Sequence, residues 1–182
     1  MESNNFLIEV FGKQFRSGLS DHQKELITDS FRTDQFKKKE IIFRNGDTKT
    51  RHYFVERGLL RLYIIDPKGK EINILFAREG QVIGDLATPE PTNFNLETIE
   101  DSIVHSIDEF GMQSLMKKLN LNSEMDPAHG MRRSYIHIQN RMVSLLSKTA
   151  AENYQDFTSK YPVLNQRLPQ YHVASYLGIS PE

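Results

Sequence analysis

The chain of 182 residues contains no cysteine, which excludes disulfide bonds, cysteine-ligated iron–sulfur clusters and thiol redox sensors. It also has no run near the roughly 18 consecutive apolar residues of a membrane-spanning helix. Its first residues, MESNN, lack the basic and apolar regions of a signal peptide. We therefore expect a cytoplasmic protein with no membrane partner. Its hydrophobic share of 38% and charged share of 26% are typical of a globular chain, here of one or two domains.

Positive charge is concentrated toward the C-terminus. Residues 131–182 hold 6 Lys and Arg against 3 Asp and Glu, a balance of +3. Because the whole chain carries −1, residues 1–130 carry −4. This distribution is expected if only the C-terminal part meets nucleic-acid phosphates.

The spacing of apolar residues changes twice along the chain. Residues 5–32 have the spacing of short helices, and helical spacing returns from about residue 108. Between residues 34 and 108, glycines recur near turns at intervals of 11 or 12, which indicates short strands of an antiparallel sandwich or barrel. The clearest element is a hairpin over about 58–76, with a type I turn at residues 66–69 (DPKG). In its first strand Leu60 and Leu62 alternate with Arg61 and Tyr63, as in a strand with one buried face.

A long helix is expected over residues 126–160, with Asp126 and Pro127 as its start signal. Five of its apolar residues are spaced 4, 3, 4 and 3, which is the spacing of a seam between paired helices. We predict that they form the interface of a homodimer: Met131, Tyr135, Ile138, Met142 and Leu145. The seam lasts little more than two heptads, and a helix lying on its own β-domain is the alternative. Residues 161 and 162 (YP) end the helix, and 163–168 are expected to link it to the last motif.

Residues 170–179 have the pattern of the first helix and turn of a helix-turn-helix. Ala174 stands where two helices must approach closely, and Gly178 stands where the turn needs a residue that tolerates positive φ. Residues 180–182 (SPE) then have the order of a second helix start. An ordinary helix capped by glycine and followed by another helix has the same pattern.

The given sequence ends at Glu182, before the helix that such modules place in the DNA major groove. We therefore expect the 182-residue chain alone to bind DNA poorly, and a longer reading frame with Thr, Ser and Arg just after Glu182 would favour DNA binding. The candidates for contact with DNA lie at the openings of the two helices. They are Arg167, Gln170, Tyr171, Ser180 and Glu182.

In their order and spacing, several segments together resemble the Crp/Fnr family of bacterial transcription regulators. They are residues 43–47 (FRNGD), 53–61 (YFVERGLLR), 66–71 (DPKGKE), 80–86 (GQVIGDL) and 167–182. The resemblance implies an α+β fold: an antiparallel β-roll, or double-stranded β-helix, of the cyclic-nucleotide-binding kind, with N-terminal helices, a long dimerisation helix and the first part of a winged helix-turn-helix. It implies a sensor domain at 1–125, the dimer helix at 126–160 and the start of the DNA-binding domain at 161–182. The implied partners are DNA, a second copy, RNA polymerase and a small effector.

The resemblance also marks an effector pocket, and there this sequence departs from the family pattern. Cyclic-nucleotide binders of the family hold the ribose with a Gly-Glu-Leu segment and the cyclic phosphate with a later Arg-Ser or Arg-Thr. The matching positions, our effector-pocket candidates, are Gly84, Asp85, Leu86, Thr92 and Asn93. Residues 80–116 contain no Lys or Arg, so a buried phosphate would lack a cationic partner. We predict that cyclic AMP is not bound in the usual way; an uncharged effector, a different one, or none stays open.

We expect no cofactor, no metal site and no enzymatic activity. His52 and His105 lie in predicted strands but lack the His-x-His, Glu and distant His that metal-dependent cupins need. We also assign neither of them to haem. No nucleophile-elbow motif supports a hydrolase. The main interpretation is a dimeric regulator that binds DNA; the alternatives are a β-roll sensor of small molecules without DNA binding, and a cupin-like enzyme.

Overall fold

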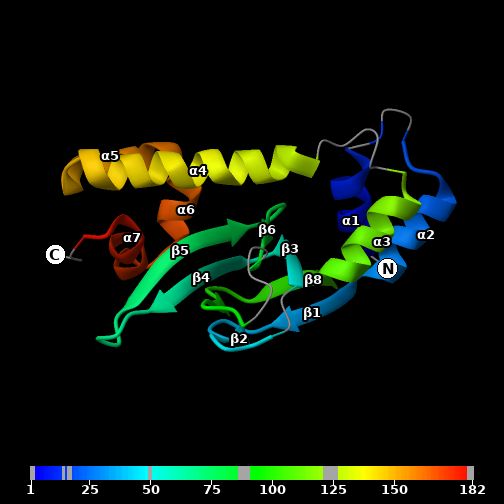
Figure 1. Cartoon of the computed structure of the whole chain (residues 1–182), viewed down its shortest axis with the longest axis horizontal. Coiled ribbons are helices and arrows are strands. Elements are labelled where there is room, and N and C mark those ends of the chain that lie inside the picture. The colour runs from blue at the N-terminus through cyan, green and yellow to red at the C-terminus, as the bar shows by residue number, and fades with distance from the viewer. Residues whose placement is uncertain are drawn as a thin grey trace. The chain divides into compact units, whose positions relative to one another are not determined.

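The computed structural model describes residues 3–13, 15, 18–48, 51–85, 91–120 and 127–179 (Figure 1). The chain divides into two compact units, Met1–Leu62 with Phe76–Asp126 and Tyr63–Leu75 with Pro127–Glu182. Of the helices in the described part of the chain, none is both long and apolar enough to cross a membrane.

The first unit holds most of two four-stranded sheets, whose hairpin residues 63–75 belong to the second unit. The strands are β1 (Arg32–Phe36), β2 (Ile41–Phe43), β3 (Arg51–Arg57), β4 (Leu59–Ile65), β5 (Glu71–Arg78), β6 (Val82–Ile83), β7 (Asn95–Thr98) and β8 (Ser102–Asp108). Their orders are β1-β8-β3-β6 and β2-β7-β4-β5. The pairs β1–β8, β8–β3, β3–β6 and β2–β7 are all antiparallel. The prediction of an antiparallel β-roll is therefore confirmed.

Three helices pack against this β-structure: α1 (Ser3–Gly12), α2 (Asp21–Ser30) and α3 (Glu109–Lys118) (Figure 1). Their apolar faces meet side chains of β3 and β8 in one buried cluster. The cluster consists of Leu7, Phe11, Ile27, Phe54, Ile107, Leu115 and Leu119. The N-terminal helices flank the roll, as the sequence predicts.

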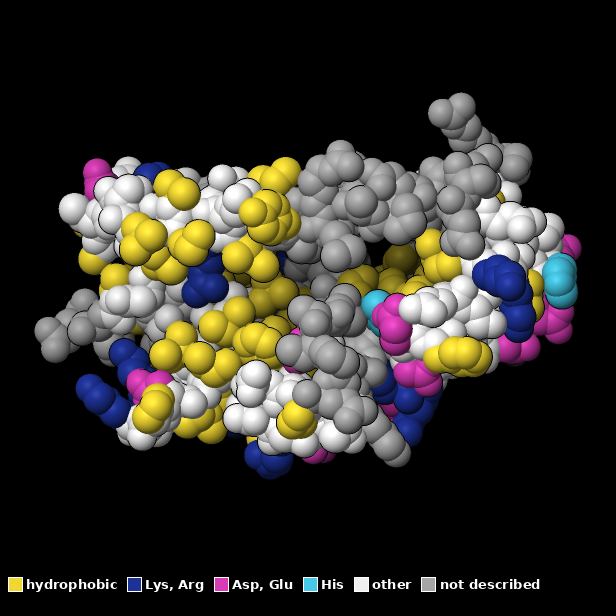
Figure 2. Space-filling model, in the orientation of Figure 1, with side chains coloured by type: hydrophobic (Ala, Val, Ile, Leu, Met, Phe, Trp, Pro, Cys, Tyr) yellow, Lys and Arg dark blue, Asp and Glu magenta, His cyan; other side chains and the backbone are white. Residues whose placement is uncertain are grey.

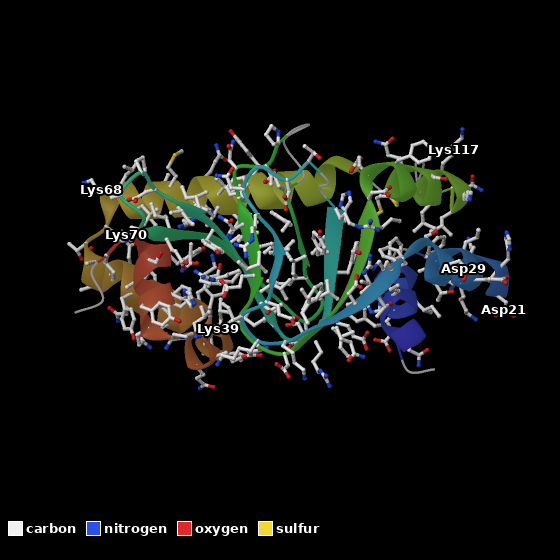
Figure 3. The ribbon with its side chains drawn as sticks, turned by 90° about the horizontal axis from the view of Figure 1, so that it is seen from below. Asp21, Asp29, Lys39, Lys68, Lys70 and Lys117 are labelled. Atoms are coloured by element: carbon white, nitrogen blue, oxygen red, sulfur yellow. The ribbon has the colours of Figure 1, made fainter. Side chains whose placement is uncertain are left out.

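The β4–β5 hairpin forms at the predicted place. The Gly69 amide donates to the Asp66 carbonyl at 2.9 Å, which closes the predicted four-residue turn. The Asp66 side chain also accepts from the Lys68 and Lys70 amides, at 2.8 and 2.9 Å. Figure 3 shows Lys68 and Lys70 at the end of the hairpin, where both are exposed.

The second unit holds α4 (Pro127–Ser147), α5 (Ala150–Lys160), α6 (Pro162–Arg167) and α7 (Gln170–Leu177). The single helix expected over 126–160 is thus two helices, which corrects the prediction. Thr149 caps α5: its hydroxyl accepts from the Glu152 amide at 3.3 Å, and its own amide donates to the Glu152 carboxylate at 2.8 Å. This reciprocal capping box starts a new helix and breaks the old one. Asp126 lies outside the described residues.

The two helices form a hairpin held by one buried amide. The Ser144 hydroxyl donates to Asn153 Oδ1 at 2.6 Å, and Asn153 Nδ2 donates back to the Ser144 carbonyl at 3.3 Å. The expected linker over 163–168 is also different, because α6 occupies most of it. Pro162 is the first residue of α6, a position that proline favours because its missing N–H is not needed there.

Candidate functional site

Two of the effector-pocket candidates lie together inside the β-roll. Asp85 and Thr92 are both buried, and the Thr92 hydroxyl donates to Asp85 Oδ2 at 2.6 Å. The backbone of Thr92 is held by the segment before β3, through bonds to the Gly46 amide (2.8 Å) and the Asp47 carbonyl (3.0 Å). The side chain that the resemblance places at the phosphate position is therefore bonded to the carboxylate that it places at the ribose position.

The other three candidates are distributed differently. Asn93 is exposed, whereas Gly84 is partly buried beside Asp85 in the chain. Leu86 lies outside the described residues. The hydrogen bond between Thr92 and Asp85 therefore joins two of the four described candidates.

A buried ion pair in the roll was not predicted. Arg61 of β4 is 4% exposed, and its Nε donates to Glu97 Oε2 of β7 at 2.9 Å. A guanidinium nitrogen also contacts the same oxygen. The alternating pattern placed Arg61 on an exposed face, but residues 59–63 are all buried. Because Glu97 neutralises it, Arg61 does not provide an unopposed cation for a phosphate.

The two strand histidines have structural partners. His105 is buried, with Nε2 2.6 Å from a Glu56 carboxylate oxygen and Nδ1 2.8 Å from the Thr33 hydroxyl. It thereby connects β8 to both neighbouring strands, and both of its ring nitrogens are engaged. His52 Nε2 lies 2.7 Å from Glu109 Oε2. Within the described residues no group of His, Asp or Glu has an arrangement that could hold a metal ion.

Helix α7 has the shape expected for the first helix of a helix-turn-helix. Val173, Ala174 and Leu177 are buried. Gly178 follows with φ 67° and ψ 28°, and its amide donates back to the last turn of α7. This left-handed turn is accessible to glycine at little cost.

The DNA-contact candidates fall into two groups. Gln170 and Tyr171 are exposed at the start of α7, and Arg167 is partly exposed at the end of α6. Ser180 and Glu182 lie outside the described residues. The exposed start of α7 is therefore open to a partner.

Helix α7 is held against strand β5, the last strand of its sheet. The Ser175 hydroxyl accepts from the Asn73 amide at 3.0 Å and donates to the Glu71 carbonyl at 2.8 Å. Asn73 Nδ2 lies 3.1 Å from His172 Nδ1 and 3.2 Å from the His172 carbonyl oxygen. These bonds satisfy edge-strand groups that no neighbouring strand reaches in the described part of the sheet.

Arg141 of α4 binds both α7 and β5 and was not singled out from the sequence. Its guanidinium donates to the carbonyls of Ile74 (2.8 Å), Asn73 (3.1 Å) and Tyr176 (2.7 Å). It also lies 4.0 Å from the centroid of the Tyr176 ring. Burial lowers the pKa of Arg141, yet an arginine remains protonated at neutral pH. One cation thus ties α4 to β5 and to the end of α7.

The dimer-seam candidates form an exposed apolar row on α4. Their exposed fractions are 61% for Tyr135, 62% for Ile138, 55% for Met142 and 39% for Leu145. Ile136, Val143 and Leu146 widen the row and are also exposed, and Figure 2 shows apolar side chains gathered along this helix. The side chain of Met131 lies outside the described part of α4. Among the described residues of the second unit nothing covers this face, so the row is free to pack against another chain.

Known proteins with the same fold include transcription regulators. Residues 33–118 match the family described as cyclic nucleotide-binding domain. FixK2 from Bradyrhizobium japonicum is 20% identical over 83% of this chain and 79% of that chain, with a TM-score of 0.70. The c-di-GMP responsive global regulator CLP of Xanthomonas campestris is 17% identical over 89% and 86%, with a TM-score of 0.70.

The catabolite activator protein of Thermus thermophilus is 18% identical over 92% of this chain and 81% of that chain, with a TM-score of 0.56. A search of curated proteins gave no match. Residues 33–118 thus match the cyclic nucleotide-binding domain, and the chain shares the Crp-like fold of these three structures.

Proposed function

We propose that the chain is a transcription regulator of the Crp/Fnr type that acts in the cytoplasm and binds DNA as a homodimer. The observation that carries this proposal is the order of three parts: a cyclic-nucleotide-binding type of β-roll, the exposed apolar row on α4, and α7 with its left-handed turn at Gly178. A helix-turn-helix places the helix after such a turn in the major groove. The regulators among the structures of the same fold support the same function.

The proposed mechanism couples the roll to DNA through α4. A change in the roll alters the pairing of two α4 helices, and this pairing sets the spacing of the two DNA-reading elements. Arg141 connects α4 to the end of α7, so a shift of α4 reaches α7 through direct bonds. RNA polymerase is a further partner that this function implies.

The seam on α4 gives the first test. We expect the paired substitution Ile138→Glu and Met142→Glu to weaken the dimer more than about a hundredfold, because it places carboxylates in a desolvated apolar seam. Sedimentation equilibrium measures the dimer constant. Binding to DNA is measured by selecting the sequences that the full-length protein binds from a pool of random DNA duplexes. The unsubstituted protein should enrich a two-fold symmetric site with half-sites about 10 base pairs apart, and the variant should enrich none.

Gln155→Glu is the control. Gln155 is exposed on α5, outside the apolar row of α4, so its carboxylate should stay in water. A dimer that the paired variant and the control disturb equally would contradict the seam. If the protein forms the dimer but enriches no DNA site, the alternative function is favoured: a sensor of small molecules that does not bind DNA.

We also infer that cyclic AMP is not the effector in the family's usual manner. The Thr92 hydroxyl already donates a hydrogen bond to the Asp85 carboxylate, and Arg61 is already paired with Glu97. A cyclic phosphate in this pocket would give up its hydration without gaining a cationic partner among these side chains.

Calorimetry tests the effector directly. We expect cyclic AMP to bind the chain with a dissociation constant weaker than about 1 mM, which corresponds to roughly 4 kcal/mol of binding free energy. Submillimolar binding that Asp85→Asn abolishes would contradict the inference. A thermal-shift screen of cyclic GMP, haem and metabolites runs beside it, because a ligand of the folded state raises Tm.

A further inference from the structure

A hollow in the second unit is separate from the candidate effector pocket of the roll. Its volume is about 360 Å³, and it lies between the last turns of α4, the facing side of α5 and the end of α7. This volume is in the range of small-molecule sites, which start near 300 Å³. The hollow belongs to the helical hairpin that carries α7.

The charged side chains around the hollow are mostly cations. Arg141, Lys148 and Lys160 line it, against the single carboxylate of Asp156, which is already paired with Lys148. Within the described part of the chain, Lys160 has no carboxylate partner; its Nζ lies 5.3 Å from the centroid of the Tyr161 ring. The lining therefore has a balance of +2 in a chain whose net charge is −1.

His137 forms part of the wall near these cations, which affect its pKa. Burial lowers the pKa of His137 below its usual value, and repulsion from Lys160 and Arg141 lowers it further. The Nε atom of Arg141 is buried and has no acceptor among the described residues. The hollow thus holds more positive charge and donor capacity than its own wall balances.

Aromatic rings form another part of the wall. Phe157 lies with its centroid 5.6 Å from that of Tyr161 and 5.7 Å from that of Tyr176, and all three rings line the hollow. Flat rings favour a flat ligand. We propose that this hollow binds a small aromatic anion, a carboxylate or a phosphate monoester, with Lys160 and Arg141 as its charged contacts.

Such a ligand would act where α7 is fixed. Arg141 lines the hollow and also donates to the Tyr176 carbonyl at the end of α7. An anion that binds this guanidinium would therefore weaken its hydrogen bond to the Tyr176 carbonyl, which holds the end of α7. The site does not depend on DNA binding, so the binding test below is independent of the proposed function.

Benzoate and phenyl phosphate are the probes, and benzamide is the neutral analogue with the same ring. We expect saturable shifts of backbone amide signals over residues 141–160 with the two anions and none with benzamide, in NMR titrations of the chain. Lys160→Gln should weaken anion binding about tenfold, because it removes one charge-assisted contact. Lys117→Gln is the control, since Lys117 is exposed on α3 in the other unit (Figure 3). Binding should also raise the pKa of His137, because an anion offsets Lys160 and Arg141.

Any of three results would contradict the proposed site. The first is that neither anion shifts the amide signals, and the second is that the anions bind Lys160→Gln as tightly as the unsubstituted chain. The third is that benzamide binds as well as benzoate. A dimer constant that changes in Lys160→Gln, without any anion binding, would show that a second chain covers the hollow instead.

Discussion

Replacing Arg141 by glutamine is expected to free the end of α7 and to lower the free energy of unfolding by about 3 kcal/mol. The guanidinium donates to three backbone carbonyls on two elements, and bonds to a charged donor contribute about 1.5 to 3 kcal/mol each. The variant also loses the stacking on Tyr176. The expected loss is smaller than the sum of three such bonds, because water can reach part of these groups once the arginine is gone.

Hydrogen exchange locates the effect, because it reports the opening of each helix and strand separately in a chain of two compact units. Amides of α7 should exchange about a hundredfold faster in the variant, whereas those of β3 and β8 should change little. Asn73, Ser175 and His172 still hold α7 to β5, so the helix is loosened and not lost.

Arg32→Gln is the control for loss of a positive charge. The Arg32 side chain is 72% exposed and pairs with Asp34 at the surface, so its removal should change stability by less than about 0.5 kcal/mol. Arg141→Lys should fall between the two, since one ammonium cannot reach three carbonyls in the fixed geometry of a guanidinium. Equal exchange rates in Arg141→Gln and Arg32→Gln would show that Arg141 does not hold α7.

The parts of the fold that the sequence predicts are those set by neighbouring residues. The hairpin over 58–76 follows from alternation and a turn of four residues, and the φ of Gly178 follows from the place of a glycine at a helix end. The break between α4 and α5 was also signalled locally, by Thr149 and Glu152 as a capping box. This signal was overlooked because the helical spacing of apolar residues continues from residue 131 to residue 150, across the turn between the two helices.

The parts that the sequence did not predict depend on distant residues. Glu97 is 36 positions from Arg61, and nothing near Arg61 indicates that both faces of β4 are covered. Arg141 and Asn73 are 68 positions apart and meet only because β5 is an edge strand next to α7. For the candidate effector site, the sequence named Asp85 and Thr92, but their mutual hydrogen bond appears only in the folded chain.

Gly58→Ala is expected to lower the free energy of unfolding by about 3 kcal/mol or more, enough to reduce Tm by roughly 10 °C. Gly58 stands between β3 and β4, where the chain passes from one sheet to the other. Its φ is 105°, which side chains disfavour, and a Cβ there would lie 2.1 Å from Ser102 Oγ and 2.8 Å from Ser102 Cα. Since the second contact is with backbone, β8 itself would have to move.

Gly80→Ala separates the two causes. Gly80 has φ 80°, but a Cβ added there would meet no described atom within 4 Å, so only the backbone strain of about 1 kcal/mol applies. Gly58→Ala combined with Ser102→Gly removes the Oγ and Cβ contacts and leaves the one to Cα, so it should recover part of the loss. Guanidinium denaturation of the three variants measures these differences. If Gly58→Ala costs no more than Gly80→Ala, the close approach of β8 is not what requires glycine at this corner, and positive φ alone explains it.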